Sequence, residues 1–434
     1  MSIDIQRDIN GVLQHIGRIS KEDTSTPYFT YDAAYLNTPH AQPLSFSLPL
    51  QEEAFSEKRF RPYFEGLLPE GTALDNLVAD LGIRRDDYLG ILAHCGLDCI
   101  GDVVVDAGAY RSSRAYELLS FEKLKDFSGK PFSVAQEQVF SRLSLAGTQN
   151  KCGLFHDDSK PLRSGWYRPL GGAPSNYILK FARAELPDLM LIEYLCLTCA
   201  RVCGLNVPPT HLLDLGRPAL CIKRFDRGKA TGEILNGQSV PSRLHQEDLS
   251  QAFGLIPASK YFELDPSTAA AVALFLRTHS AYPARDIVEL ARIVCFDYLI
   301  GNCDNHLKNR SVIYAPQGGF SSLAPVYDVV STTYYARFSR KMGMRIGSAS
   351  HIDAIVPADF IQFAQELGIS QKILEKIAQE LAEKSVSALR SIAEALIFEG
   401  FTQAGYVADN MEEDMLPRLE VLRKVAAQEI PSPH

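Results

Sequence analysis

Residues 297–328 read DYLIGNCDNHLKNRSVIYAPQGGFSSLAPVYD and combine an apolar end, a polar loop and a hairpin-like unit. The stretch begins inside an apolar run without a polar face that stops at Gly301, which predicts the end of a buried helix. A polar loop follows at once. Beyond it, RSVIY and FSSLAPVY are strand-like runs that flank the turn signal PQGG, so we expect a hairpin that places Asp328 just past its second strand.

The polar loop contains Asp304 and Asn309, separated by four residues as in the catalytic loop of protein kinases. A site that transfers phosphate needs hard oxygen ligands for magnesium and one carboxylate left to orient the attacking hydroxyl. We therefore expect Asp304 to be the free carboxylate, and Asn309 and Asp328 to be the magnesium ligands. Within this stretch alone, ordinary turn residues that fall at this spacing by chance explain the pattern equally well.

Composition sets the broad class of the protein. A chain of 434 residues is too long for one simple core and suggests two or three domains. Its 46% hydrophobic and 22% charged residues are typical of a soluble globular protein, and its net charge of -8 argues against unaided binding of nucleic acid. The start lacks a signal peptide and the longest apolar run, 269–276, is too short to cross a bilayer, so we expect a cytoplasmic protein with no membrane partner.

The nine cysteines agree with a reducing compartment, because their number is odd and they sit in apolar segments. Cys95 and Cys99 form a CxxxC pair with no second pair of matching spacing nearby, which favours core packing over a metal site. Cys196, Cys199 and Cys203 repeat at intervals of three and four, as on one buried stripe of a helix.

Residues 1–110 alternate strand-like and turn-like pieces and predict a small α+β subdomain. The expected strands include GVLQHIGRI (11–19), PYFTYD (27–32) and PLSFSLPL (43–50), the last with one face in a core and one outward. A helical insert is expected around RPYFEGLLPE (61–70), and a last strand at IGDVVVD (100–106).

Residues 111–140 are expected to form an exposed, charged helical connector. SRLSLAGTQNKCGLF (141–155) then predicts strand, loop and strand, and a loop around Gly147 could offer backbone N–H groups to an anion or be a plain hairpin turn. SNYILKF (175–181) is a strand with Lys180 near its end. Glu193 lies on the following helix, which is the lysine–glutamate arrangement of many kinases, although an unrelated surface pair would have the same sequence.

PALCIKRFDRG (218–228) predicts another strand, which leaves at Asp226 into a Gly-rich connection through about residue 243. We interpret this connection as a hinge between two lobes. The chain beyond it is expected to be helical except for the hairpin, with the 3.6-residue period around 268–278, 286–300, 357–367, 371–397 and 412–429. The basic run Arg337, Arg340, Lys341 and Arg345 could receive a phosphate or an acidic partner, or be a solvated surface.

Taken together, the motifs SLAGTQNK, YILK, KRFD, LHQEDL, GNCDNHLKN and PVYD resemble, in order and spacing, those of HipA-type serine/threonine kinases, the toxins of bacterial toxin–antitoxin pairs. GVLQHIGRI, PLSFSLPL and FEGLLPEG extend the resemblance over nearly the whole chain. It implies an α+β, two-lobed protein-kinase-like fold with an extra amino-terminal subdomain. The expected domains are 1–110, a nucleotide lobe with phosphate loop and hinge at 111–230, and an all-helical carboxy-terminal lobe at 231–434 that carries the catalytic loop.

The resemblance also implies roles for individual residues. Asp304 would be the catalytic base, Asn309 and Asp328 would hold Mg²⁺, Glu193 would support Lys180, and Ser144 would be an autophosphorylation site that silences the enzyme. The implied ATP-binding residues are Ala146, Gly147, Thr148, Gln149, Asn150, Lys151, Lys180, Lys223, Arg224, Phe225, Asp226, His306, Lys308 and Tyr327. Among these, the backbone of 223–225 would meet adenine and Asp226 would lie near the ribose.

The implied partners are a protein substrate, with aminoacyl-tRNA synthetases as the family-type target, and a HipB-like helix-turn-helix antitoxin that brings any contact with DNA. Two other functions remain open. DNHLKN also resembles the D-x-H-x-x-N loop of phosphoinositide kinases, which would indicate a lipid or small-molecule kinase. A non-catalytic module that binds an antitoxin and DNA is the other.

Overall fold

The computed structural model describes residues 2–22, 26–39, 41–108, 113–128, 137, 145–147, 149–315 and 321–428. They divide into two compact units. The first unit is made of Met1–Glu185, His211–Pro257 and Ile313–Gly319, and the second of Leu186–Thr210, Ala258–Val312 and Phe320–His434. Neither unit is a continuous segment, so the chain passes from one to the other several times.

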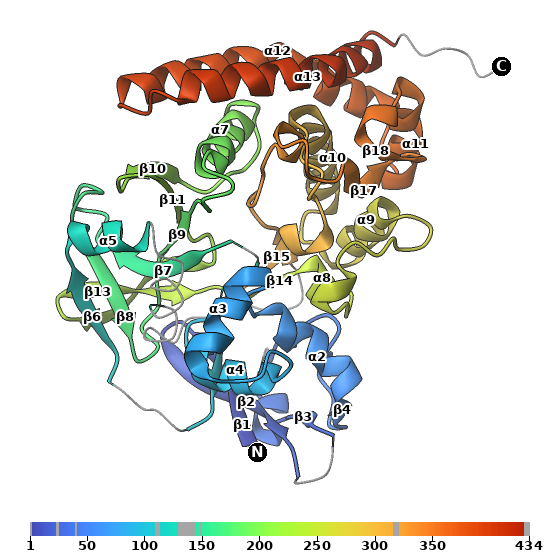
Figure 1. Cartoon of the computed structure of the whole chain (residues 1–434). Helices are drawn as coiled ribbons and strands as arrows, with labels where there is room; N and C mark the ends of the chain where they lie inside the picture. Colours follow the sequence, from blue (N-terminus) through green and yellow to red (C-terminus); the bar gives the residue numbers. More distant parts are fainter. Residues whose placement is uncertain are drawn as a thin grey trace. The chain divides into compact units, whose positions relative to one another are not determined.

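The first unit begins with a five-stranded antiparallel sheet in the order β4-β3-β2-β1-β5, shown in blue in Figure 1. Its strands are β1 (Ser2–Ile9), β2 (Val12–Ser20), β3 (Tyr28–Tyr31), β4 (Phe55–Ser56) and β5 (Val103–Asp106). The helices that accompany it are α1 (Ala33–Leu36), α2 (Glu57–Gly66), α3 (Gly71–Leu81) and α4 (Tyr88–Cys95). Ile3 and Phe29 of the strands share one buried core with Phe60 and Phe64 of α2, so the sheet and its helices form one α+β subdomain, as predicted.

A six-stranded sheet in the order β10-β11-β9-β7-β8-β6 forms the second part of this unit. Its strands are β6 (Ala115–Leu119), β7 (Lys151–His156), β8 (Trp166–Leu170), β9 (Tyr177–Phe181), β10 (Thr210–Asp214) and β11 (Pro218–Lys223), with α5 (Phe121–Phe127) after β6. Leu154, Leu179 and Cys221 face one core together with Trp166. The predicted strands at 175–181 and 218–228 are confirmed, whereas the connector predicted as helical contains β6 as well as α5, and its later part lies outside the described residues.

The strand predicted at 43–50 is wrong. These residues form turns, with one isolated bridge between Ser45 and Leu48, and Ser45 is fully buried instead of facing outward. Its hydroxyl donates to the Glu247 carboxylate at 2.5 Å, and the Phe46 N–H donates to the same carboxylate at 3.0 Å. Alternation of apolar and polar residues was therefore misleading, because the buried serine is satisfied by an acidic residue about 200 positions away.

The connection predicted between Asp226 and about residue 243 is a β-hairpin, β12 (Arg227–Leu235) with β13 (Gln238–Arg243). Its turn is Asn236-Gly237, both with positive φ (50° and 80°), which is the residue pair that a tight hairpin turn favours. The Asn-Gly turn signal is present in the sequence. Our interpretation of this segment as a Gly-rich connection overlooked it. The strand β14 (Gln246–Asp248) and the helix α8 (Leu249–Ala252) follow.

Helices dominate the second unit, and all five predicted periodic segments are confirmed. They are α9 (Thr268–His279), α10 (Pro283–Ile300), α11 (Pro357–Leu367), α12 (Gln371–Phe398) and α13 (Ala404–Ala426), and α7 (Leu189–Val202) belongs to the same unit. The long helices α12 and α13 pack along each other, in red in Figure 1, and α12 also packs on α7 and α10. In the described part of the chain no helix has both the length and the apolarity needed to cross a bilayer.

The carboxy-terminal region is not wholly helical as expected, because β17 (Lys341–Ile346) and β18 (Ala349–His351) form a hairpin in it. The side chains of β17 alternate between buried and less buried positions, and Gly347 provides the positive φ of the turn. The hairpin after the polar loop consists of β15 (Ser311–Tyr314) and β16 (Ser321–Leu323).

All nine cysteines are buried and free of disulfides, which confirms their predicted place in the core.

Candidate active site

The loop after α10 presents one accessible side chain. Helix α10 ends at Gly301, whose φ of 78° gives the left-handed helix cap that the sequence predicts. Of residues 301–310, Asp304 is the one that is not buried, and its side chain is 49% exposed. A carboxylate presented in this way can meet a ligand from solvent without any rearrangement of the loop.

A buried ion pair supports this loop from the α10 side. Asp297, fully buried on α10, accepts from Arg310 at the far end of the loop and from Asn302 Nδ2 at 2.8 Å. Arg310 Nη1 also donates to the Asn309 carbonyl at 2.6 Å. Burial raises the pKa of Asp297 and the Arg310 guanidinium offsets part of that shift, so the pair fixes the two ends of the loop at some electrostatic cost.

Strand β17 supports the loop from another side. The N–H of Gly343 donates to the Cys303 carbonyl at 3.0 Å, and the N–H of Met344 donates to Asn305 Oδ1 at 2.9 Å. A Cβ at Gly343 would lie 2.8 Å from the backbone nitrogen of His306, so only glycine allows this approach. The hairpin that the sequence did not predict therefore supports the loop that carries Asp304.

Asn309 and Asp328 are the two predicted magnesium ligands, and each carries a side-chain oxygen of the kind that a hard cation prefers. The Asn309 side-chain amide donates from Nδ2 to the Asp304 carbonyl at 2.8 Å, and because a carbonyl only accepts, this bond leaves Oδ1 as the ligand atom. Asp328 has a φ of 51°, a left-handed conformation that is uncommon outside glycine and tends to occur at functional sites. The Tyr327 hydroxyl donates to the Lys308 carbonyl at 2.9 Å and so holds the residue before Asp328 on the loop.

The other predicted site residues of this unit lie on the same loop or beside it. His306 is buried, with Nε2 3.5 Å from Asp304 Oδ1, and Lys308 is buried on the short 3₁₀ turn η2 (Leu307–Asn309). Glu193 is buried on α7, one turn before Cys196, whose thiol is bonded to the backbone of Ser331. Residues one turn apart share a helix face, so Glu193 faces the segment that follows Asp328.

In the first unit, Lys151 of β7 and Lys180 of β9 are directly opposed cross-strand partners. Opposed residues point to the same face of a sheet, so the two ammonium-bearing side chains lie next to each other. Ile178, Leu220 and Ile222 occupy the same face, because they pair with Gly153, Lys180 and Ile178 respectively. One face of this sheet therefore combines an apolar surface with two adjacent cations, which suits a purine nucleotide with its phosphates.

The predicted phosphate loop is described in part. Gly147 has a φ of 105°, and a Cβ placed on it would lie 2.9 Å from Lys151 Nζ, so its backbone and the ammonium group are close neighbours. The Glu70 N–H donates to the Gly147 carbonyl at 2.9 Å. Ala146, Gln149 and Asn150 flank these residues. Ser144 and Thr148 lie outside the described residues, so their predicted roles stay predictions.

The predicted hinge residues are held by one another and by the backbone of Asn176 and Gly101. The N–H of Arg224 is donated to the Asn176 carbonyl at 2.9 Å, so this group is not a donor for adenine. The Asp226 carboxylate accepts from Gly101 N–H at 2.7 Å, from Arg224 Nε and Nη2 at 2.9 and 2.7 Å, and from Arg227 at 3.0 Å. A ribose contact by Asp226, as predicted, would require one of these bonds to open.

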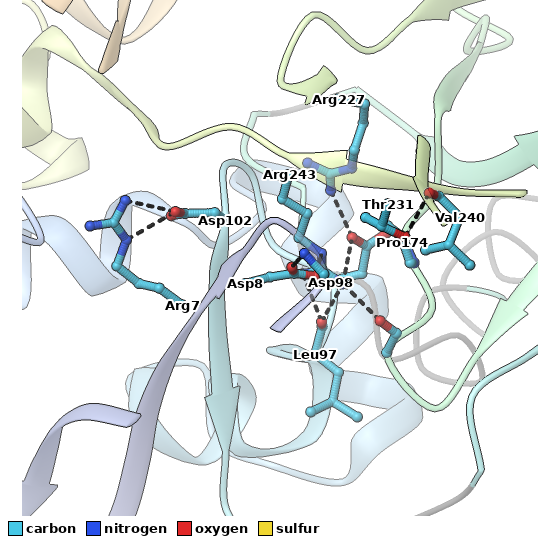
Figure 2. Close-up of polar contacts among 12 residues, drawn as sticks. Arg7, Asp8, Leu97, Asp98, Asp102, Pro174, Arg227, Thr231, Val240 and Arg243 are labelled. Atoms are coloured by element: carbon cyan, nitrogen blue, oxygen red, sulfur yellow. Dashed lines mark hydrogen bonds and ion pairs between the residues drawn. The ribbon is translucent and has the colours of Figure 1, made fainter. Parts of the chain in front are cut away.

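Figure 2 shows the buried charges around this hinge. Asp98 lies 2.7 Å from Arg227 and 3.5 Å from Arg243, and Asp8 lies 3.5 Å from Arg243. Asp98 also lies 3.6 Å from Arg224. Burial alone would raise the pKa of Asp98, but the three guanidinium groups outweigh it and hold that pKa below its ordinary value. Burial also lowers the pKa of Arg227 to about 10, helped by repulsion from Arg224.

A second buried pair lies in the same region of the unit. Arg7 donates to Asp102 at 2.7 Å and 2.9 Å, and His245 Nδ1 lies 2.9 Å from the other Asp102 oxygen. Arg7 and His245 overcome the effect of burial and hold the pKa of Asp102 low, while burial and the charge of Arg7 lower the pKa of His245. His245 belongs to the LHQEDL motif, which is thus structural at this position.

The sequence analysis did not predict roles for two residues, Glu247 and Tyr261. Glu247 of the same motif is fully buried and accepts from Ser45, Phe46 N–H and Tyr314, and burial raises its pKa to about 7 against these three bonds. Tyr261 contacts Asp304. Neither could be found from spacing, because both contacts join segments separated by more than 40 residues.

The basic run is largely paired with acidic residues. Arg340 donates two bonds of 2.6 Å to Asp353, and Arg345 lies 3.3 Å from both Glu263 and Glu366. Among the described residues no group of three or more His, Cys, Asp or Glu could hold a metal ion. A magnesium ion bound with a nucleotide needs only one or two protein ligands besides phosphate oxygens, and Asn309 with Asp328 fits that requirement.

Comparison with known proteins identifies the relatives of the chain. Residues 143–389 match the HipA-like C-terminal domain family, and residues 10–106 match the HipA N-terminal domain family. Y4mE of Sinorhizobium fredii, which carries a kinase designation, is 30% identical over 391 residues, covering 87% of this chain and 90% of the relative. The serine/threonine-protein kinase toxin HipA of Shewanella oneidensis is 28% identical, covering 87% of each chain.

A solved structure shows the same fold. The chain superimposes with a TM-score of 0.76 and 22% identity on a structure of the Shewanella oneidensis HipA, HipB and operator DNA complex, over 99% of this chain and 100% of that one. The predicted α+β, two-lobed fold class and the predicted family resemblance are thereby confirmed.

Proposed function

The chain belongs to the HipA kinase family, and from that premise we propose that it is an ATP- and Mg²⁺-dependent serine/threonine-protein kinase that acts as the toxin of a toxin–antitoxin pair. One observation carries the proposal. Asp304 is the accessible carboxylate of an otherwise buried loop, and Asn309 is bonded to its backbone with an oxygen left for a cation. This is the arrangement that orients a hydroxyl next to a metal-bound phosphate.

The chemistry follows from these groups. The hydroxyl oxygen of a serine or threonine attacks the γ-phosphorus of ATP, the bond to the β–γ bridging oxygen breaks and leaves ADP, and Asp304 receives the hydroxyl proton. Asn309 and Asp328 would hold Mg²⁺, which when bound would supply neutralisation of the phosphate charge. Lys151 and Lys180 would pair with the phosphates, and Glu193 would support Lys180.

The remaining predicted site residues would bind the nucleotide or hold the residues that bind it. The apolar side chains beside Lys151 and Lys180 support a purine site, with the backbone around Lys223 and Phe225 as its hinge. His306 and Lys308 would lie near the phosphates. Asp226 and Arg224 would hold the hinge in place through the buried charges of Asp98 and its neighbours, which the structure supports better than a contact with ribose.

Regulation is proposed on the family pattern. Phosphate on Ser144 would add between one and two negative charges at about neutral pH next to a loop that serves ATP's own phosphates, and repulsion would expel the loop. A HipB-like helix-turn-helix antitoxin would bind the chain and bring it to DNA, since a chain with a net charge of -8 is a poor binder of DNA by itself. A cytosolic protein, of the aminoacyl-tRNA synthetase type, would be the substrate.

The proposed kinase activity is tested by following the transfer of labelled phosphate from ATP. The purified full chain is incubated with γ-labelled ATP and Mg²⁺ in a cytosolic extract and, separately, with extracted lipid, beside Asp304→Asn and a matched exposed-carboxylate control, Asp353→Asn. We expect label on serine or threonine of a protein, lost in Asp304→Asn and kept in Asp353→Asn. Label in lipid alone would indicate a lipid kinase, and growth arrest by Asp304→Asn without any label transfer would indicate a non-catalytic binding module.

A further inference from the structure

Tyr261 lies directly on the predicted catalytic base. It follows the short 3₁₀ turn η1 (Pro257–Ser259), and its hydroxyl donates a hydrogen bond to Asp304 Oδ1. Its ring meets the ring of His306 edge to face, with centroids 5.0 Å apart at 76°. His306 Nε2 lies 3.5 Å from the same Asp304 oxygen. Phenol, imidazole and carboxylate therefore form one cluster inside the second unit.

The hydrogen bond from Tyr261 to Asp304 is of the kind that a substrate hydroxyl would make with this carboxylate. A general base in phosphoryl transfer accepts a hydrogen bond from the hydroxyl that attacks, and here a side-chain hydroxyl of the protein makes this bond. An oxygen of Asp304 that already accepts from Tyr261 is less available to another hydroxyl or to water. The incoming acceptor must therefore displace Tyr261 or compete with it.

The contact is also accessible enough to open. Tyr261 is 55% exposed and the Asp304 side chain 49% exposed, so both groups can exchange their mutual bond for bonds to solvent or ligand. A single hydrogen bond in such a position changes an equilibrium by a factor of about two to ten. A residue with this strength of contact can screen the base from water, yet yield to a substrate that brings binding energy of its own.

We propose that Tyr261 is a positioning residue that occupies the acceptor oxygen of Asp304 until a substrate hydroxyl displaces it, so that the enzyme discriminates against water as the phosphate acceptor. The inference rests on the proposed kinase function. The bland alternative is that Tyr261 packs on His306 and its hydroxyl contact has no effect on turnover. The two differ in what happens to ATP when no protein acceptor is present.

The test is the release of inorganic phosphate from ATP by the purified full chain without an acceptor. Tyr261→Phe keeps the ring on His306 and removes the hydroxyl. We expect it to raise the turnover of hydrolysis about two- to tenfold, the range of one exposed hydrogen bond, with the KM for ATP unchanged. A double variant that combines Tyr261→Phe with Asp304→Asn should return to background, because the extra hydrolysis needs the base.

Tyr282→Phe is the matched control. Tyr282 is 58% exposed in the same unit, and its ring stacks on Arg285 instead of the catalytic loop, so loss of its hydroxyl should leave hydrolysis as in the wild type. Unchanged or slower hydrolysis in a Tyr261→Phe protein that melts like the wild type would overturn the inference. A wild-type chain that transfers no phosphate to protein would overturn the proposed function instead, so the two failures are distinguishable.

Discussion

The buried charges of Asp98, Asp226 and their arginine partners, which we name the hinge anchor after the predicted hinge, differ from the proposed catalytic loop around Asp304 in how they use charged groups. At the hinge, Asp98 and Asp226 are buried and every carboxylate oxygen named above faces a guanidinium or an N–H group. In the loop, the Asp304 side chain is 49% exposed, and the tyrosine that donates to it, Tyr261, is exposed as well. Membership of a motif therefore does not tell a structural carboxylate from a catalytic one. Burial, and whether the hydrogen-bond partners can be displaced, distinguish the two.

The comparison predicts that the same chemical change has different consequences in the two regions. Asp304→Asn removes the proton acceptor from an exposed position and leaves no buried charge behind. We expect phosphoryl transfer to fall about 10²- to 10⁴-fold, the usual contribution of a general base, with the thermal unfolding midpoint unchanged. Initial rates and a thermal melt of the same preparation measure both quantities, and a rate within threefold of the wild type would remove Asp304 from the chemistry.

Asp98→Asn makes the equivalent change at the hinge anchor. The variant leaves three buried guanidinium groups, those of Arg224, Arg227 and Arg243, with two carboxylates, those of Asp226 and Asp8. One buried positive charge is then unbalanced, so we expect a loss of about 3–5 kcal/mol in the free energy of unfolding. Urea unfolding followed by the fluorescence of Trp166 reports on this unit, because Trp166 is its buried tryptophan and the sequence has one.

The control for Asp98→Asn is Asp4→Asn, which breaks the exposed pair with Arg18 in the same unit and should cost at most about 1 kcal/mol. Equal losses of unfolding free energy in the two variants would show that the buried charges do not stabilise the unit more than an exposed pair does.

The sequence predicted what depends on local pattern and missed what depends on distant partners. Strand β9 with Lys180, and helix α10 with its end at Gly301, follow from periodicity and cap residues, and the structure has them where expected. Residues 43–50 were wrongly predicted as a strand, and the buried contacts of Asp226 were not predicted. In both cases the partner, Glu247 or Gly101, is far away in sequence. Tyr261 lies in a segment without periodicity, and no spacing rule connects it to Asp304.

Glu247, buried in the first unit, makes the stability of that unit depend on pH. Its pKa is raised from 4.5 to about 7, so its contribution to stability is present below pH 4.5 and is lost as the pH rises through 7. A shift of this size corresponds to about 3 kcal/mol. Glu247→Gln cannot ionise, and the difference in unfolding free energy between wild type and variant should shrink by this amount from pH 4.5 to 8. A difference that stays constant over the range would contradict the burial argument.

An exposed ion pair in the second unit should have the smallest effect. Asp353 accepts two bonds of 2.6 Å from Arg340, but both side chains are partly exposed, so Asp353→Asn should cost between 0 and about 1 kcal/mol. Phosphoryl transfer should not change. Loss of activity in Asp353→Asn, measured by the initial rate with labelled ATP, would show that the basic run around Arg340 takes part in function after all.

We propose that Lys180 and Lys151 bind the phosphates of ATP and that Asp304 is the base for phosphoryl transfer from it. The most direct test of this proposal uses an acyl-phosphate derivative of ATP, which transfers its acyl group to an amine beside the phosphates, with the modified lysines identified by mass spectrometry. We predict modification of Lys180 or Lys151, suppressed by excess ATP with Mg²⁺ and weakened in a variant that combines Asn309→Ala with Asp328→Ala. Modification confined to other lysines, or insensitive to ATP and to the two loop substitutions, would contradict the account.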